Sequence, residues 1–219
     1  ESDFATMTYT PDATSATVSL AANAGASRKV EATFKSGLAE ASVAIGQQND
    51  PSVKVGWFLV TDVNELAVGD KVIIAAKNPD ETLDYAIKKY ASTTSTSMGI
   101  AIELIGNSIS NVEGVEQFTL GSGLADYEGT WSFVCDTYSR YLYITSSNIK
   151  IKSTLDSAGA WTIAIADDGK ATLTSKVAVS KNTMMFNYTT SNQTFSANTA
   201  TTTGKGAIYI YKYYNSLEQ

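Results

Sequence analysis

Short runs in which apolar and polar residues alternate recur along most of the chain. Four of them lie within the first 48 residues, at positions 4–9, 16–20, 29–34 and 41–45, and turn-forming residues separate them. An alternation with a period of two places every second side chain on the same face of a β-sheet. The first segment therefore predicts four strands of an antiparallel sandwich.

The rest of the chain continues this pattern with short spacings. Beyond residue 98, nearly every stretch of about 8 to 12 residues combines one β-run with one turn signal, which is typical of an all-β sandwich or barrel. Between residues 57 and 98 we expect strands at 57–60, 71–76 and 83–87, although residues 84–91 also fit two helical turns. One helical turn over 63–67 is expected to begin at Asp62 and to end at Gly69. The clearest later runs lie at 131–135, 141–144, 161–165, 171–174, 184–186 and 207–211.

The predicted fold class is therefore all-β. We expect a short sandwich segment followed by an antiparallel barrel or sandwich of about ten to twelve strands. A β-trefoil is the alternative, because the length and the aromatic-rich hairpins of the second part suit it, but no threefold repeat of about 50 residues is visible. Residues 47–52 contain no apolar side chain and one proline, which is typical of an exposed linker. We therefore predict domains at 1–48 and 57–214, joined by a linker at 49–56.

The composition excludes most catalytic chemistry. The 219 residues contain no histidine and one cysteine, Cys135. Histidine-based acid–base catalysis, a Ser-His-Asp triad, an internal disulfide and a cluster of soft metal ligands are therefore impossible. Asp62, Asn64 and Asp70 are spaced unlike a calcium loop, and we interpret Asp62 as a helix cap and Asp70 as a turn residue. We predict no enzymatic activity, no cofactor and no metal site.

A pair of carboxylates, as in glycosidases, is the remaining catalytic possibility. The candidates are not part of any motif, and most flank turns, where acidic side chains cap backbone amides or face water. The favoured interpretation is therefore structural. The candidate residues are Glu103, Glu113, Glu116, Asp126, Glu128 and Asp136.

Charge and surface composition limit the partners. The net charge of −6 and the pI near 4.7 argue against nucleic acid, because binding to phosphate backbones depends on lysine and arginine. The strongest apolar run, at 72–76, has the length of a strand and not of a membrane span. Serine and threonine make up 51 residues, while charged residues make up only 17%. This composition is typical of exported β-proteins, and we expect a location outside the cell or on its surface.

The tyrosines provide the best candidate for a binding site. Tyr141 and Tyr143 should share one face of a strand, and Tyr209 and Tyr211 should share one face of another. A tyrosine combines an apolar ring with a hydroxyl group, which suits stacking on a sugar. The alternative is that these rings fill the interior or the rim of a barrel. The predicted ligand-binding residues are Tyr138, Arg140, Tyr141, Tyr143, Asn148, Tyr209 and Tyr211.

Two segments resemble known families. Residues 18–23, 28–34 and 42–47, including Asn23, Arg28 and Gln47, resemble the last strands of a BACON domain, an immunoglobulin-like module of Bacteroidetes surface proteins. The runs 57–62, 68–74, 141–143, 160–163, 181–187 and 208–212 are similar to an uncharacterised β-rich domain at the C-terminal end of exported Bacteroidetes proteins. The resemblance implies an immunoglobulin-like segment and an accessory module on the cell exterior, and it supplies no catalytic residue.

These observations lead to one functional expectation and two alternatives. We expect a non-catalytic accessory module of the cell surface that binds glycan weakly or acts as a spacer. The first alternative is a protein-interaction or adhesin module, in which a sheet edge or an apolar patch joins another surface protein. The second is a glycosidase with two carboxylates in one cleft.

Overall fold

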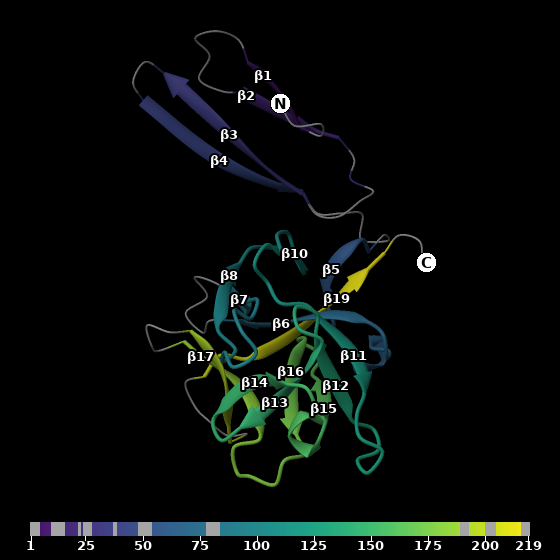
Figure 1. Ribbon diagram of the computed structural model, residues 1–219. Coiled ribbons are helices and arrows are strands. Elements are labelled where there is room, and N and C mark those ends of the chain that lie inside the picture. Colours follow the sequence, from purple (N-terminus) through teal and green to yellow (C-terminus); the bar gives the residue numbers. More distant parts are fainter. Residues whose placement is uncertain are drawn as a thin grey trace. The chain divides into compact units, whose positions relative to one another are not determined.

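The computed structural model describes residues 5–9, 16–21, 23, 28–36, 39–47, 54–77, 84–188, 193–199 and 205–215 (Figure 1). The chain divides into two compact units, Glu1–Gly56 with Tyr214–Gln219, and Trp57–Tyr213. The protein is all-β, as predicted. The only helical elements among the described residues are two short 3₁₀ turns. Residues 49–53 of the predicted linker, residue 4 of the first predicted strand and residue 83 of a later one lie outside the described residues.

The first unit contains the four strands that the alternating runs predict. They pair antiparallel within two separate sheets, β1 with β2 and β3 with β4. The register places Val30 opposite Ile45 and Ala32 opposite Val43, so one face of the β3–β4 sheet is apolar. The bounds are β1 Ala5–Tyr9, β2 Ala16–Leu20, β3 Arg28–Ser36 and β4 Ala39–Gln47.

A small polar cluster holds the two hairpins of this unit together. The Arg28 guanidinium donates to Gln47 Oε1 at 2.9 Å and to the Ala21 carbonyl at 2.8 Å. The Gln47 amide donates to the same carbonyl at 2.7 Å. Arg28 and Gln47, two of the residues on which the resemblance to a BACON domain rests, therefore fix the end of β2 to the start of β3 and the end of β4.

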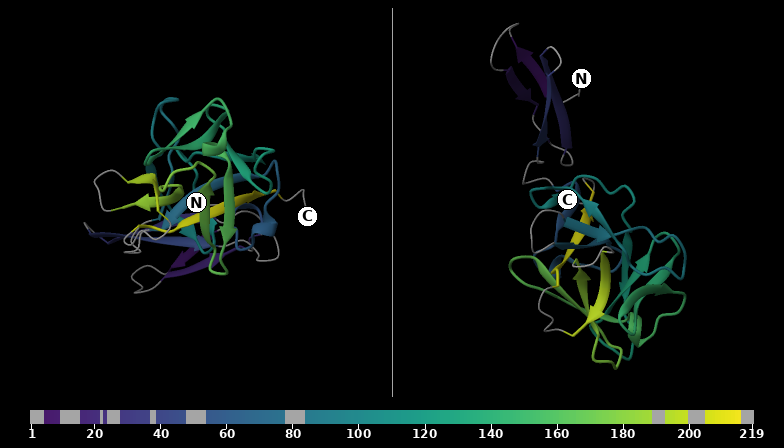
Figure 2. Two further views of the ribbon diagram at one scale, coloured as in Figure 1. Left: turned by 90° about the horizontal axis from the view of Figure 1, so that it is seen from below. Right: turned by 90° about the vertical axis from the view of Figure 1, so that its left-hand side faces the viewer.

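The second unit is a closed antiparallel barrel. The strand pairings form a ring of nine strands, β6, β11, β12, β13, β14, β18, β17, β16 and β19, which returns to β6. Strand β15 pairs with both β12 and β16, so it also closes a shorter ring of six strands, β6, β11, β12, β15, β16 and β19. Figure 2 shows this unit from two further directions. The predicted antiparallel barrel is therefore confirmed.

The order of these strands is that of a β-trefoil, the alternative that the length and the hairpins left open. Each of three modules contributes two strands to the six-stranded ring, and a two-stranded hairpin lies between them in sequence. In chain order the first module is β6 Lys71–Lys77, β7 Asp84–Ile87, β8 Gly99–Ile102 and β11 Phe118–Ser122. The second is β12 Trp131–Cys135, β13 Arg140–Thr145, β14 Asn148–Lys152 and β15 Trp161–Ile165. The third is β16 Lys170–Ser175, β17 Thr183–Asn187, β18 Thr194–Asn198 and β19 Ile208–Tyr214.

The threefold repeat is hidden in the sequence because the modules differ in length. They begin at residues 71, 131 and 170, so the intervals are 60 and 39 residues. Two connections of the first module contribute most of the difference. One joins β7 to β8, and the other joins β8 to β11 and carries two short strands, β9 Leu104–Ile105 and β10 Ser108–Ile109. Strand β10 pairs with β5 Gly56–Leu59. No single period fits such a chain, so a repeat of constant length is not visible in it.

Alternating residues of the barrel strands fill its interior. Phe118, Phe133, Trp161, Leu173 and Ile210 are all buried in one continuous cluster. The Phe133 ring meets the rings of Phe118 and Trp161 edge to face, each with centroids 6.3 Å apart. Phe133 and Cys135 alternate along β12 and therefore share its inner face, where both are fully buried.

The outer faces of β6 and β19 are covered as well. Tyr209, Tyr211 and Ile73 lie on these faces and are buried in a second apolar cluster with Trp57 and Ile109. The rest of this cluster comes from β5, from the β7–β8 hairpin and from the long segment between β8 and β11. Strand β6 is therefore buried on both faces, which explains its unbroken apolar sequence.

The entry into the barrel is fixed by a capped 3₁₀ turn, η1 Val63–Glu65. The Asp62 carboxylate accepts from the Asn64 amide at 2.8 Å, and the Glu65 carboxylate accepts from the Asp62 amide at 3.2 Å. Asp70 accepts from the Ala67 amide at 2.7 Å and pairs with Lys212 at 2.8 Å. The prediction of a cap at Asp62 is confirmed. A second turn, η2 Ser157–Gly159, is capped by Asp156.

Two buried phenols make the stability of the barrel sensitive to alkaline pH. Tyr90 is 4% exposed, with its hydroxyl 2.5 Å from Ser97 Oγ, and Tyr211 is 2% exposed. Burial raises the pKa of both phenols above the ordinary value of 10.0. Below pH 10 both the folded and the unfolded chain keep these protons, so neither group changes the stability. Above pH 10 the unfolded chain ionises first, and each phenol should lower the free energy of unfolding by about 1.4 kcal/mol per pH unit.

Urea unfolding between about pH 8 and pH 11 measures this loss. Tyr211→Phe should reduce the slope above pH 10, whereas Tyr138→Phe, at an exposed site, should leave it unchanged. An equal slope in Tyr211→Phe and the unchanged protein would contradict the assignment.

Candidate functional site

The β13–β14 hairpin carries a half-exposed aromatic surface, which we call the tyrosine face. Its register places Tyr141 opposite Lys152, Tyr143 opposite Lys150, and Thr145 opposite Asn148. The side chains between them, Leu142, Ile144, Ile149 and Ile151, point inward and are buried. The tyrosine face therefore consists of Tyr141, Tyr143, Thr145, Asn148, Lys150 and Lys152.

Lys152 orders one edge of this face. Its ammonium group lies 4.4 Å from the centroid of the Tyr143 ring and forms an ion pair with Asp156. Partial burial opposes ionisation of Asp156, but the hydrogen bonds from Lys152 and from the Ala158 amide outweigh it and lower the pKa of this carboxyl. Lys150 makes no ion pair with any described residue. The face thus combines two phenol rings with charged and amide hydrogen-bond donors.

The structure separates the other predicted ligand residues from this face. Arg140 lies opposite Cys135, so strand alternation directs it to the other side of β13. Tyr138 lies in the turn before β13 and is 36% exposed. Tyr209 and Tyr211 are 6% and 2% exposed, and their rings belong to the second apolar cluster. The idea that Tyr209 and Tyr211 stack on a ligand is therefore wrong, because their own chain covers them.

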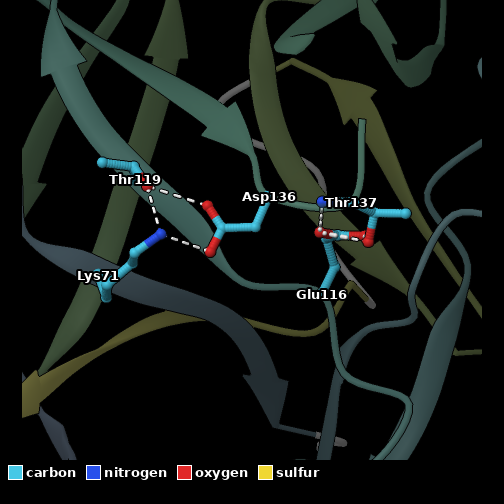
Figure 3. A network of polar contacts seen from close by, with 5 residues as sticks. All are labelled: Lys71, Glu116, Thr119, Asp136 and Thr137. Carbon is cyan, nitrogen blue, oxygen red and sulfur yellow. Dashed lines mark hydrogen bonds and ion pairs between the residues drawn. The ribbon is translucent and has the colours of Figure 1, made fainter. Parts of the chain in front are cut away.

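Two of the candidate carboxylates are tied into polar networks beside the barrel wall (Figure 3). The Asp136 carboxylate accepts from Lys71 Nζ at 2.6 Å and from Thr119 Oγ1 at 2.9 Å. Lys71 also donates to Thr119 Oγ1 at 2.8 Å. The side chains of Lys71 and Asp136 are 44% and 31% exposed, so this network lies at the surface.

The second carboxylate in Figure 3, Glu116, is 1% exposed. Its oxygens accept from the Tyr90 amide at 3.2 Å, from the Thr137 amide at 3.1 Å and from the Thr137 hydroxyl at 2.8 Å. Glu116 therefore supplies an acceptor to the amide of the buried Tyr90, which would otherwise have no partner, and it also ties down the exposed Thr137. This geometry agrees with the structural interpretation of the acidic residues.

The thiol of Cys135, which lies near Glu116, is also shielded from solvent. Cys135 is fully buried, and burial raises the pKa of its thiol to about 12. A thiol reacts through its ionised form. Cys135 therefore behaves as a small apolar core residue, as the alternation in β12 predicts.

A second candidate site lies beside the loop between β11 and β12, and we call it the β11–β12 groove. Its volume is about 360 Å³. Trp131, at the start of β12, is the only partly exposed tryptophan, since Trp57 is 8% exposed and Trp161 is fully buried. The groove is lined by Val68, Ser122, Gly123, Leu124, Ala125, Tyr127, Glu128, Gly129, Thr130 and Trp131.

Short hydrogen bonds hold the wall of this groove in shape. The Tyr127 amide donates to the Leu124 carbonyl at 2.9 Å, and the Thr130 hydroxyl donates to the Tyr127 carbonyl at 2.6 Å. The Gly123 amide donates to the Thr130 carbonyl at 2.8 Å. A Cβ atom on Gly123 would lie 2.0 Å from Thr130 Oγ1, so only glycine permits this approach. The groove is therefore built before any ligand arrives.

Sequence reasoning misses the groove for a clear reason. Trp131 alternates with Phe133, so the pattern assigns it to the core, and Glu128 is a candidate only as a catalytic carboxylate. The exposure of Trp131 at the start of β12 depends on the loop between β11 and β12 and on Val68, which is distant from Trp131 in the sequence. The only local sign of this loop in the sequence is the pair Gly123 and Gly129. Glycine permits backbone conformations with a positive φ, and Gly129 adopts one at 72°.

The described part of the chain lacks two kinds of feature. None of its helices is long and apolar enough to span a bilayer. Within the same ranges, no three His, Cys, Asp or Glu side chains are grouped closely enough to hold a metal ion.

Comparison with known proteins adds the fold alone. No family model and no curated protein matches the sequence. The solved structure of the BEL β-trefoil is 12% identical, with a TM-score of 0.50 over 70% of this chain and 99% of that chain. Cytolethal distending toxin structures from Actinobacillus actinomycetemcomitans and Haemophilus ducreyi have TM-scores of 0.46 and 0.44 and identities of 14% and 12%. They cover 67% and 64% of this chain, and 94% and 82% of their own.

Proposed function

We propose that this protein is a non-catalytic accessory module that binds glycan weakly through the tyrosine face. The observation that carries the proposal is the pairing of Tyr141 and Tyr143 on one half-exposed face, with Asn148 and Lys150 on the neighbouring strand. Phenol rings stack on the apolar faces of sugars, while amide and ammonium groups bind sugar hydroxyls. A β-hairpin positions these groups on a rigid element.

The arrangement of the carboxylates supports a non-catalytic role. A glycosidase needs one protonated and one ionised carboxyl group facing the same bond. Here both oxygens of Glu116 are buried and accept internal hydrogen bonds, and Asp136 is occupied by Lys71 and Thr119. These side chains stabilise the barrel wall.

The proposed location is the cell exterior, in agreement with the resemblance to exported Bacteroidetes modules. The supporting observations are the 51 serine and threonine residues and the low share of charged residues.

Affinity electrophoresis in soluble polysaccharides, followed by calorimetry with the retained sugar, tests the proposal. We expect dissociation constants in the millimolar range. The double substitution Tyr141→Ala and Tyr143→Ala should weaken binding by about tenfold or more, because each ring contributes roughly 0.5 to 1.5 kcal/mol of stacking.

Tyr138→Ala provides the matched control, because this exposed tyrosine lies outside the tyrosine face and should leave binding unchanged. Circular dichroism would verify that each variant keeps its β-structure. The proposal fails if no polysaccharide is retained, or if the double variant binds as tightly as the unchanged protein.

A further inference from the structure

The β11–β12 groove differs chemically from the tyrosine face. Most of its lining is apolar or aromatic, with Trp131 and Tyr127 beside Val68 and Leu124. Val68 is 61% exposed, which is high for an aliphatic side chain. Such a wall favours a ligand with an apolar body.

Glu128 supplies the only charge in the lining, all of whose residues the structure describes. Its exposed carboxylate makes no hydrogen bond or ion pair with any described residue. Asp126, which is also exposed, lies two positions away in the same loop. The groove therefore offers negative charge at an apolar and aromatic surface, and the whole chain carries a net charge of −6.

Part of the polar lining of the groove is already committed to internal hydrogen bonds. The Thr130 hydroxyl is committed to the Tyr127 carbonyl, and the Ser122 carbonyl accepts from the Ser132 hydroxyl. The only ionised group that remains in the lining is the Glu128 carboxylate, and a charged donor bonds to a carboxylate more strongly than a neutral hydroxyl does. A cation on an alkyl chain fits both parts, because its charge is attracted to carboxylates and aromatic faces.

We propose that the β11–β12 groove binds a lysine side chain of a partner polypeptide. The four methylene groups pack against Val68, Leu124 and the Trp131 ring, and the ammonium group pairs with Glu128. The hydrogen-bonded loop around Gly123 and Thr130 holds this geometry before binding, so little order must be created on association. This site is independent of the glycan site on β13–β14.

Two small ligands of equal length test the proposal. Nα-acetyl-lysine amide carries the charge, and Nα-acetyl-norleucine amide has the same stem without the ammonium group. Binding is followed by backbone amide shifts of residues 123–131 and by tryptophan emission, to which Trp131 responds as the only partly exposed indole. The lysine derivative should bind in the millimolar range and at least about fivefold more tightly than the norleucine derivative.

The variant Glu128→Gln should abolish the preference for the lysine derivative while leaving the fold intact. Glu113→Gln, at another exposed position, is the matched control and should keep the preference. Raising the salt concentration should weaken only the lysine derivative. Equal binding of the two ligands to the unchanged protein, no shift at residues 123–131, or identical behaviour of the two variants would each overturn the proposal. Saccharide binding at the tyrosine face does not affect these outcomes.

Discussion

Replacing Trp161 by alanine is expected to lower the free energy of unfolding by about 5 kcal/mol, a large share of the stability of a domain of this size. Trp161 is fully buried in the barrel, where its ring meets Phe133 edge to face. Truncation leaves a cavity that the closed ring of strands cannot fill by moving inward. Loss of the buried ring alone costs about 3 to 5 kcal/mol. It also removes the 3.0 Å hydrogen bond from the indole nitrogen to the Leu142 carbonyl.

Denaturant unfolding monitored by circular dichroism measures this effect. The variant Trp161→Phe separates the two contributions, because it keeps most of the ring but cannot donate to Leu142. It should cost about 1 to 3 kcal/mol. A loss below about 2 kcal/mol in Trp161→Ala would show that the strands relax around the cavity and that the barrel is less rigid than its pairing suggests.

Glu116→Ala is expected to lower the free energy of unfolding by about 1 to 3 kcal/mol. The carboxylate accepts from the amide of the buried Tyr90, which would lose its partner inside the protein, and from the amide of the exposed Thr137, which water can reach. A buried polar group without a partner costs about 1 to 3 kcal/mol. The substitution should also loosen the segment around Tyr90, which faster amide exchange at residues 88–98 would reveal.

Asp136→Ala is the matched control for this experiment. Both carboxylate oxygens of Asp136 accept hydrogen bonds, as those of Glu116 do, but Asp136 faces solvent, and its partner Lys71 is 44% exposed. Water can replace the lost contacts, so the cost should stay below about 1 kcal/mol. Similar losses in Glu116→Ala and Asp136→Ala would contradict the view that burial, and not the number of bonds, decides the contribution.

Local pattern predicts much of the secondary structure. The alternating runs that include Val18 and Ile45 are strands, and so are those around Leu142 and Ile163. The turn that Asp62 caps is predicted as well, because a carboxylate beside free amides acts within three residues. These features depend on neighbours along the chain, and neighbours are what a sequence displays directly.

The candidate sites show where such reasoning ends. Alternation places Tyr141 and Tyr143 on one face, and it equally places Tyr209 and Tyr211 on one face. Tertiary packing distinguishes the two pairs, because β5 and the long segment between β8 and β11 contribute to the cluster that buries Tyr209 and Tyr211, whereas Tyr141 and Tyr143 stay partly exposed. Trp131 is the reverse case, a residue that alternation assigns to the core and that lines a groove.

By itself, the sequence determined the all-β class, most of the strands, and the absence of imidazole chemistry, since each follows from side-chain type or from period. The tertiary structure decided the trefoil order of the strands, the burial of Tyr209 and Tyr211, and the groove beside Trp131. These depend on which strands pair across separations of tens of residues, such as β19 with β6. Pairing of that kind is set by the sum of many weak contacts over the whole barrel, which no local run of residues records.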